Sequence, residues 1–109
     1  AIENNLGYGK WLHGEAIACG FLIASAVAIQ NKTLKISEYE QIKNLLKLFN
    51  LPTKLPKNIN INKLFKTMML DKKVKNNEIL YILPKNIGNA YITSKINKNI
   101  ILKALKDHA

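Results

Sequence analysis

The long stretch from Ala16 to Gln30, which holds no charged residue, limits the fold of this 109-residue chain more than any other feature. Its apolar side chains fall on nearly every side of a helix, and its Ala, Gly and Ser residues let neighbouring backbones approach closely. We therefore expect a central helix from about Leu12 to Asn31. The stretch is shorter than the roughly 20 apolar residues that span a membrane, and Gly20 and Ser25 interrupt it, so we expect a buried helix and no membrane segment.

A second helix is indicated by a start signal, an apolar pattern and a stop signal. Ser37 and Glu40 have the spacing of a capping box. Asn50 and Pro52 are typical of a helix end. The residues between them place a series of apolar side chains at helical spacing: Ile42, Leu45, Leu46 and Phe49.

The rest of the chain predicts two more helices and a hairpin. A third helix should start near Asn60 or Asn62 and stop around Asp71, and a last one should cover residues 99–108. Within residues 79–94, ILYIL and AYITS flank the turn-rich string PKNIGN, which is typical of a β-hairpin. The predicted fold class is mainly α: one multi-helix domain with a small β-hairpin near residues 79–94 and no interior domain boundary.

The net charge of +10 raises the possibility of nucleic-acid binding. However, all seventeen basic residues are Lys, and Arg is the side chain that reads guanine with two hydrogen bonds. The lysines are also scattered along the chain among fourteen Asn and fifteen Ile, as expected of a solvated surface. A basic helical module that binds nucleic acid or an acidic partner stays open as the alternative function.

Residue spacing alone yields little chemistry. A helix places neither Cys19 nor Glu15 on the same side as His13, so neighbouring residues assemble no metal site. On this evidence His13 is a partly buried residue near a helix start. The single Cys19 should be an inert core thiol and indicates no oxidising compartment. His108, beside the end of the sequence, should be exposed and without a role.

The order of several short strings resembles 3-dehydroquinate synthase. The string AIENNLGYGKWLHGEAIACG is similar to that family's HAIE...GYG.WLHGEAVA.G motif, and MMLDKKV is similar to its Asp-Lys-Lys motif. LFNLPTKLP and ILYILPKNIGNAYI resemble its Leu-Pro break and its closing hairpin. The resemblance covers the whole chain in order. Since the sequence opens on Ala-Ile-Glu without Met, we expect a C-terminal, mainly helical domain (residues 1–109) of a longer enzyme whose N-terminal NAD-binding domain is missing here.

The resemblance implies a metal site that extends beyond this chain. His13 would be one of three protein ligands of a catalytic zinc or cobalt ion, with the other two outside the chain. His13 must be neutral to bind the metal, so activity should fall in acid. Glu15 and Glu3 would orient ligands or nearby amides, or else cap helices or pair on the surface. Trp11, Leu12 and Phe21 should be packing residues.

The resemblance also implies the reaction of the complete enzyme. A seven-carbon sugar phosphate, 3-deoxy-D-arabino-heptulosonate 7-phosphate, would yield 3-dehydroquinate and phosphate in the shikimate pathway, with NAD as cofactor. Lys73, or else Lys72, would be the catalytic residue that binds the anionic groups of the substrate. The alternative is that both lysines are only a solvated pair at a helix end. The implied enzyme is a cytoplasmic lyase and a homodimer, without nucleic-acid or membrane partners, and the isolated fragment should be inactive. Sugar phosphate cyclases that make inosose or valiolone products share much of this C-terminal half of the enzyme.

Overall fold

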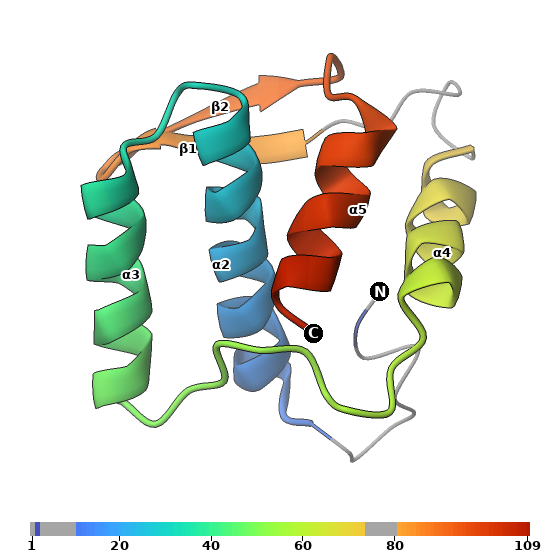
Figure 1. The fold of residues 1–109 in the computed structure, drawn as a ribbon, viewed down its shortest axis with the longest axis horizontal. Coiled ribbons are helices and arrows are strands. Elements are labelled where there is room, and N and C mark those ends of the chain that lie inside the picture. Colours follow the sequence, from blue (N-terminus) through green and yellow to red (C-terminus); the bar gives the residue numbers. More distant parts are fainter. Residues whose placement is uncertain (1, 3–10, 74–80) are drawn as a thin grey trace.

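The computed structural model describes residue 2, residues 11–73 and residues 81–109, and the side chains of 70–73 are outside the description. These ranges hold four helices and two strands (Figure 1): α2 (His13–Gln30), α3 (Ile36–Leu48), α4 (Ile61–Lys73), β1 (Tyr81–Asn86), β2 (Asn89–Thr93) and α5 (Lys98–Asp107). The mainly α fold with one hairpin is confirmed.

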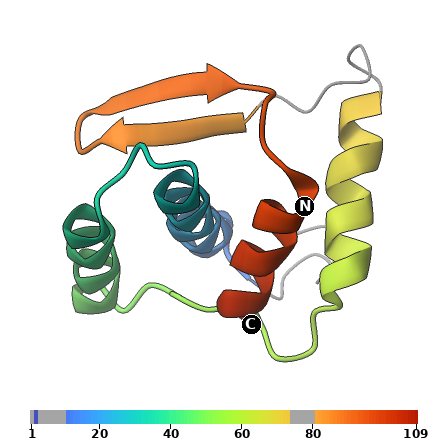
Figure 2. The same ribbon diagram turned by 45° about the horizontal axis from the view of Figure 1, so that its top comes forward.

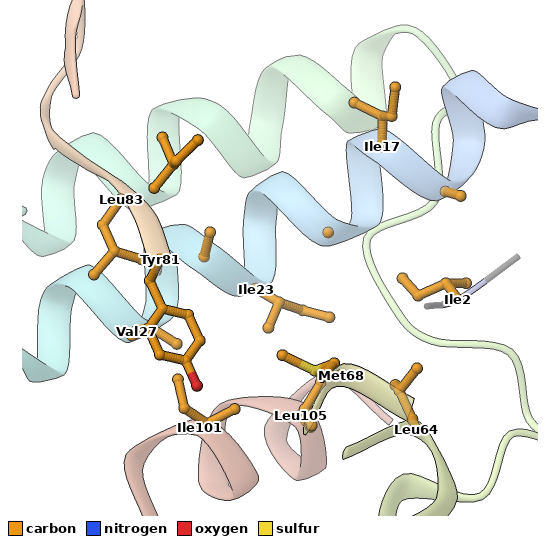
Figure 3. A pocket seen from close by; sticks show the side chains of 14 residues that line it. Ile2, Ile17, Ile23, Val27, Leu64, Met68, Tyr81, Leu83, Ile101 and Leu105 are labelled. Atoms are coloured by element: carbon orange, nitrogen blue, oxygen red, sulfur yellow. The ribbon is translucent and has the colours of Figure 1, made fainter. Parts of the chain in front are cut away.

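Helix α2 occupies the centre of the arrangement. It contacts α3 on one side and α5 on the other, and α4 packs on the far side of α5. The hairpin lies across one side of the helices, with β1 against α2 (Figure 2). Side chains from α2, β1, α4 and α5 converge between these elements (Figure 3). The central position predicted for the uncharged stretch is therefore confirmed.

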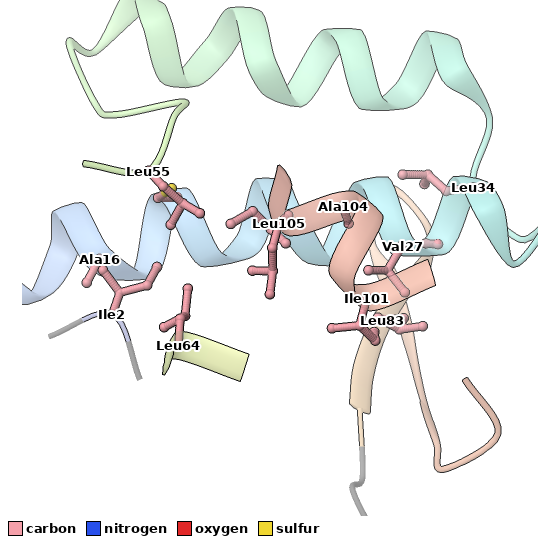
Figure 4. Packing of buried hydrophobic residues seen from close by; sticks show 13 residues of the cluster. Ile2, Ala16, Val27, Leu34, Leu55, Leu64, Leu83, Ile101, Ala104 and Leu105 are labelled. Carbon is pink, nitrogen blue, oxygen red and sulfur yellow. The ribbon is translucent and has the colours of Figure 1, made fainter. Parts of the chain in front are cut away.

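The hydrophobic core forms around α2 (Figure 4). Small residues of both helices take part in it, since Ala16 on α2 and Ala104 on α5 are buried. Larger side chains fill the remaining space, and Leu22, Leu64 and Leu83 are almost fully buried. Burying each such leucine contributes about 1.5–3 kcal/mol. By length and composition alone α2 would also suit a membrane span, but nearly half of it is buried inside this fold.

The predicted helix boundaries are mostly right, but the capping box of α3 is wrong. The helix begins at Ile36 after Lys35, with no side-chain cap, so Ser37 lies inside the first turn. Its end is as expected, because Asn50 adopts a positive φ of 57° just after Leu48 and turns the chain away. In α5, by contrast, the Asn97 side chain caps the helix by accepting a hydrogen bond from the Asn99 amide at 2.8 Å.

The hairpin pairs β1 and β2 in antiparallel register, with Leu83 opposite Tyr91 and an irregularity between Pro84 and Asn86. Gly88 makes the turn possible because its φ of +97° is strained for any other residue. Two contacts fix the hairpin to the helices. The Ile87 amide donates to Glu38 on α3 at 2.9 Å, and the Tyr91 hydroxyl lies 3.0 Å from side-chain atoms of both Asn31 and Thr33 after α2.

Candidate metal centre

His13 is the first residue of α2, and local hydrogen bonds determine where that helix begins. Leu12 has extended backbone angles, and its carbonyl accepts from the amides of Glu15 and Ala16. The Glu15 carboxylate reaches back and accepts from the Leu12 amide at 2.9 Å. This exchange satisfies amide donors that a helix start otherwise leaves unpaired. Glu15 therefore closes the turn that holds His13.

The His13 side chain is exposed to solvent. Gly14 beside it is exposed too, and a methyl group placed on Gly14 would meet nothing within 4 Å. His13 lies at a helix start as predicted, but the prediction that it is partly buried is wrong. The imidazole lies where a ligand from outside the chain can reach it.

No cluster of three or more His, Cys, Asp or Glu side chains occurs within the described ranges. Cys19 cannot join one, because its side chain is 0% exposed and burial raises the pKa of its thiol to about 11. That result agrees with the predicted inert core thiol. A metal at His13 would need further ligands from residues that the structure does not describe or from another part of a longer protein.

The second histidine has a structural role, so the prediction that His108 is exposed and without a role is wrong. His108 is only 5% exposed. Its Nδ1 lies 2.6 Å from the Ala104 carbonyl oxygen and its Nε2 lies 2.8 Å from the Tyr39 hydroxyl. Its own carbonyl accepts from the Leu55 amide at 2.5 Å. Burial, with Glu40 and Asp107 nearby, raises the pKa of Tyr39. His108 thus joins α3, α5 and the segment between α3 and α4, and it is not available to a metal.

Several predicted site residues lie outside the described part of the chain. Glu3 is among residues 3–10, which the structure does not describe. Lys72 and Lys73 end α4, but their side chains are not described. Their predicted roles stay predictions.

The three residues predicted to pack in the core differ in how far they are buried. Trp11 packs against the core as expected. Leu12 and Phe21 are exposed, so within the described chain the packing prediction is wrong for both. The sequence could not show this exposure, because the apolar character of a residue does not reveal which face of its helix lacks a neighbour.

Comparison with known proteins identifies related sequences. A family model described as "3-dehydroquinate synthase C-terminal" matches residues 1–74. A 3-dehydroquinate synthase from Prochlorococcus marinus (strain MIT 9312) is 46% identical over 102 residues, covering 94% of this chain and 28% of the relative. The same enzyme from Helicobacter pylori (strain G27) is 45% identical over 106 residues, covering 97% and 31%. The chain therefore spans about three tenths of the length of these curated relatives.

A solved structure shares the fold. It is a 2-epi-5-epi-valiolone synthase from Streptomyces hygroscopicus subsp. jinggangensis 5008, with NAD+ and Zn2+ bound. The TM-score is 0.82 at 22% identity, and the match covers 92% of this chain and 28% of that one. This similarity establishes the architecture of the described elements.

Proposed function

Because this chain belongs to the 3-dehydroquinate synthase family, as a C-terminal part, we propose that it is the C-terminal helical domain of a 3-dehydroquinate synthase. The parent enzyme would be a phosphate-eliminating lyase that converts 3-deoxy-D-arabino-heptulosonate 7-phosphate to 3-dehydroquinate and phosphate. The proposal is supported by two relatives of that name that are 46% and 45% identical across nearly the whole chain.

One structural observation carries the proposal for the site. His13 is exposed at the first residue of a helix that is otherwise anchored in the core. A neutral imidazole is a good ligand for zinc or cobalt, and the absence of a ligand cluster in the described ranges suits a site completed from elsewhere. We propose that His13 contributes one ligand to a divalent ion, zinc or cobalt. When bound, such an ion supplies Lewis-acid polarisation of the hydroxyl groups of the substrate.

The other proposed residues either position His13 or bind the substrate. Glu15 is a positioning residue, since its carboxylate closes the turn that carries His13. Glu3 is proposed to support the same end of the helix. Lys73, with Lys72 as the alternative, is proposed to bind the phosphate or carboxylate of the substrate, because a compact ammonium group suits a concentrated anionic charge. Both lysines lie in the last turn of α4.

NAD supplies the hydride chemistry and is proposed to bind mainly to an N-terminal half outside this chain. The Streptomyces synthase, which contains both NAD+ and Zn2+, supports the same pair of cofactors here. The parent is proposed to be a cytoplasmic homodimer. Without its NAD-binding half and the remaining metal ligands, the 109-residue chain should not turn over substrate.

Two other functions receive less support. A basic module that binds nucleic acid should gather its charge on one face, but lysines occur on α3, α4, β1, α5 and the loops between them. The relatives named above are enzymes, which also disfavours that alternative. A valiolone-type product is disfavoured because the identity to that cyclase is 22%, against 46% to a 3-dehydroquinate synthase.

The test is a His13→Ala variant of the full-length parent, with Lys47→Ala as a matched control on the exposed side of α3. NAD-dependent phosphate release and the bound metal per subunit are measured together. We expect the His13 variant to lose both and the control to retain both. If His13→Ala kept its metal and its activity, the proposed role of His13 would be wrong.

A further inference from the structure

Acidic residues are missing from a long part of the chain. Residues 41–70 hold six Lys and no Asp or Glu, whereas the whole chain holds seventeen Lys and seven acidic residues. This acid-free stretch covers the second half of α3, most of α4 and the connecting segment between them, residues 49–60. Lys54 and Lys57 on the connecting segment are both exposed. The segment therefore carries positive charge that no acidic neighbour in the sequence offsets.

The connecting segment is held close to the start of α2. Its Leu55 is 4% exposed and belongs to the same buried cluster as Ala16 on α2 (Figure 4). The Leu55 amide donates to the His108 carbonyl, which fixes the segment to the end of α5. Ala16 follows His13 by three residues, so the two are neighbours on the helix surface, about 4.5 Å apart along the axis. The segment thus lies at the end of the molecule where α2 begins and α5 ends (Figure 1).

Acidic side chains of the two neighbouring helix ends are engaged locally. The Glu15 carboxylate accepts from the Leu12 amide at 2.9 Å. The Asp107 carboxylate forms an ion pair with Lys103, also at 2.9 Å. Within the part of the chain that the structure describes, no acidic side chain pairs with either lysine of the connecting segment. Their positive charge is therefore available to an anion that approaches this end of the molecule.

The proposed substrate carries a phosphate and a carboxylate, and it has to reach the site at His13. Positive charge near the entrance of a site raises the local concentration of an anionic substrate. At about 0.1 M salt this effect reaches about 10 Å, which is comparable with the distance of about 8–10 Å between packed helices. The connecting segment is therefore close enough to act on a substrate at His13 without touching it.

We propose that Lys54 and Lys57 attract the anionic sugar phosphate to the His13 site through their electric field. The inference rests on the proposed function and adds two residues to it. Their role differs from that proposed for Lys73, because they act at a distance and not by binding the substrate.

Charge removal in the full-length parent tests the attraction. One variant combines Lys54→Gln and Lys57→Gln, and a second combines Lys54→Arg and Lys57→Arg, which keeps the charge in place. The matched control combines Lys95→Gln and Lys98→Gln, two exposed lysines at the opposite end of α5 (Figure 1). NAD-dependent phosphate release gives kcat and kcat/KM at ionic strengths of about 0.01 M and about 0.5 M, between which the Debye length falls from about 30 Å to below about 10 Å. Circular dichroism checks that each variant is folded.

We expect the Gln pair at positions 54 and 57 to lower kcat/KM about three- to tenfold at the lower ionic strength, with kcat unchanged. At the higher ionic strength it should match the wild type. The Arg pair should match the wild type at both, and the control pair should lower kcat/KM less than about twofold. If the Gln pair does not fold, each single Gln variant should show about a two- to threefold loss at the lower ionic strength.

Three results would overturn the proposal. Equal values of kcat/KM in the Gln pair and the control pair would show that the position of the two lysines has no effect. A loss that persists at the higher ionic strength would indicate direct contact with the substrate. A loss shared by the Arg pair would indicate that the shape of the lysine side chains matters and not their charge.

The bound metal per subunit separates this inference from the proposed function. Full metal and full kcat in the Gln pair, with the salt response of the control pair, would reject the attraction and leave the His13 site in place. Absence of phosphate release from the sugar phosphate by the wild-type parent would reject the proposed function and this inference with it.

Discussion

Alkaline pH should destabilise this chain through its single thiol. Cys19 is fully buried, and burial raises the pKa of its thiol from 9.0 to about 11. Between these values the unfolded chain releases its proton while the folded chain retains it. The contribution of Cys19 to the free energy of unfolding is therefore fully present below the lower pKa and is lost as the pH rises through the upper one. This rise in the pKa of the Cys19 thiol corresponds to about 3 kcal/mol in the free energy of unfolding.

Urea unfolding of the 109-residue chain at about pH 8 and about pH 11, followed by circular dichroism, measures this loss. Cys19→Ala removes the titrating group, and the cavity it leaves has a cost that does not depend on pH. Burial also raises the pKa values of Tyr39 and Tyr81. Because both tyrosines are present in the wild type and in the variant, their effect cancels in the comparison. The wild type should lose about 2–3 kcal/mol more than the variant over this pH range. Equal losses in the two proteins would refute the reasoning.

Three further changes test other contacts. Tyr39→Phe should lower the free energy of unfolding by about 1–2 kcal/mol in urea titrations, because the buried His108 Nε2 loses its partner at 2.8 Å; unchanged stability would show that this bond contributes nothing. Gly88→Ala should cost about 1–2 kcal/mol, measured as a lower Tm, because its φ of +97° strains any side chain although the space beside it is open; an unchanged Tm would contradict a left-handed turn. In the parent, Lys73→Ala should raise the KM for the sugar phosphate about tenfold in steady-state kinetics, and Lys72→Ala should raise it less. A larger rise in KM for Lys72→Ala than for Lys73→Ala would assign the substrate contact to Lys72.

The helices and the hairpin could be predicted because their signals are local. An uncharged stretch apolar on all sides has to be buried, and α2 is the central helix. The turn-rich PKNIGN string forms the hairpin turn around Gly88. The capping box at Ser37 failed because the helix starts at Ile36 with Lys35 in the cap position, two residues earlier than a Ser37 cap requires. A cap depends on the backbone angles of a single residue, which the surrounding fold decides.

The candidate site could be predicted only in part. A motif singled out His13, but its exposure depends on what covers α2, which no spacing rule reports. The buried contact between His108 and Tyr39 joins residues 69 positions apart, beyond the reach of local patterns. The exposure of Ile17 and Phe21 could not be predicted, because apolar side chains fall on nearly every side of this helix in the sequence. Sequence patterns report which residues are apolar, and only packing shows which of them still lack a neighbour.

Anomalous diffraction at the metal absorption edge from crystals of the full-length parent tests the central claim most directly. The account predicts an anomalous peak about 2.0–2.1 Å from a ring nitrogen of His13, as for an imidazole bound to zinc. An anomalous peak remote from His13, with the His13 ring in contact only with solvent or protein, would contradict it.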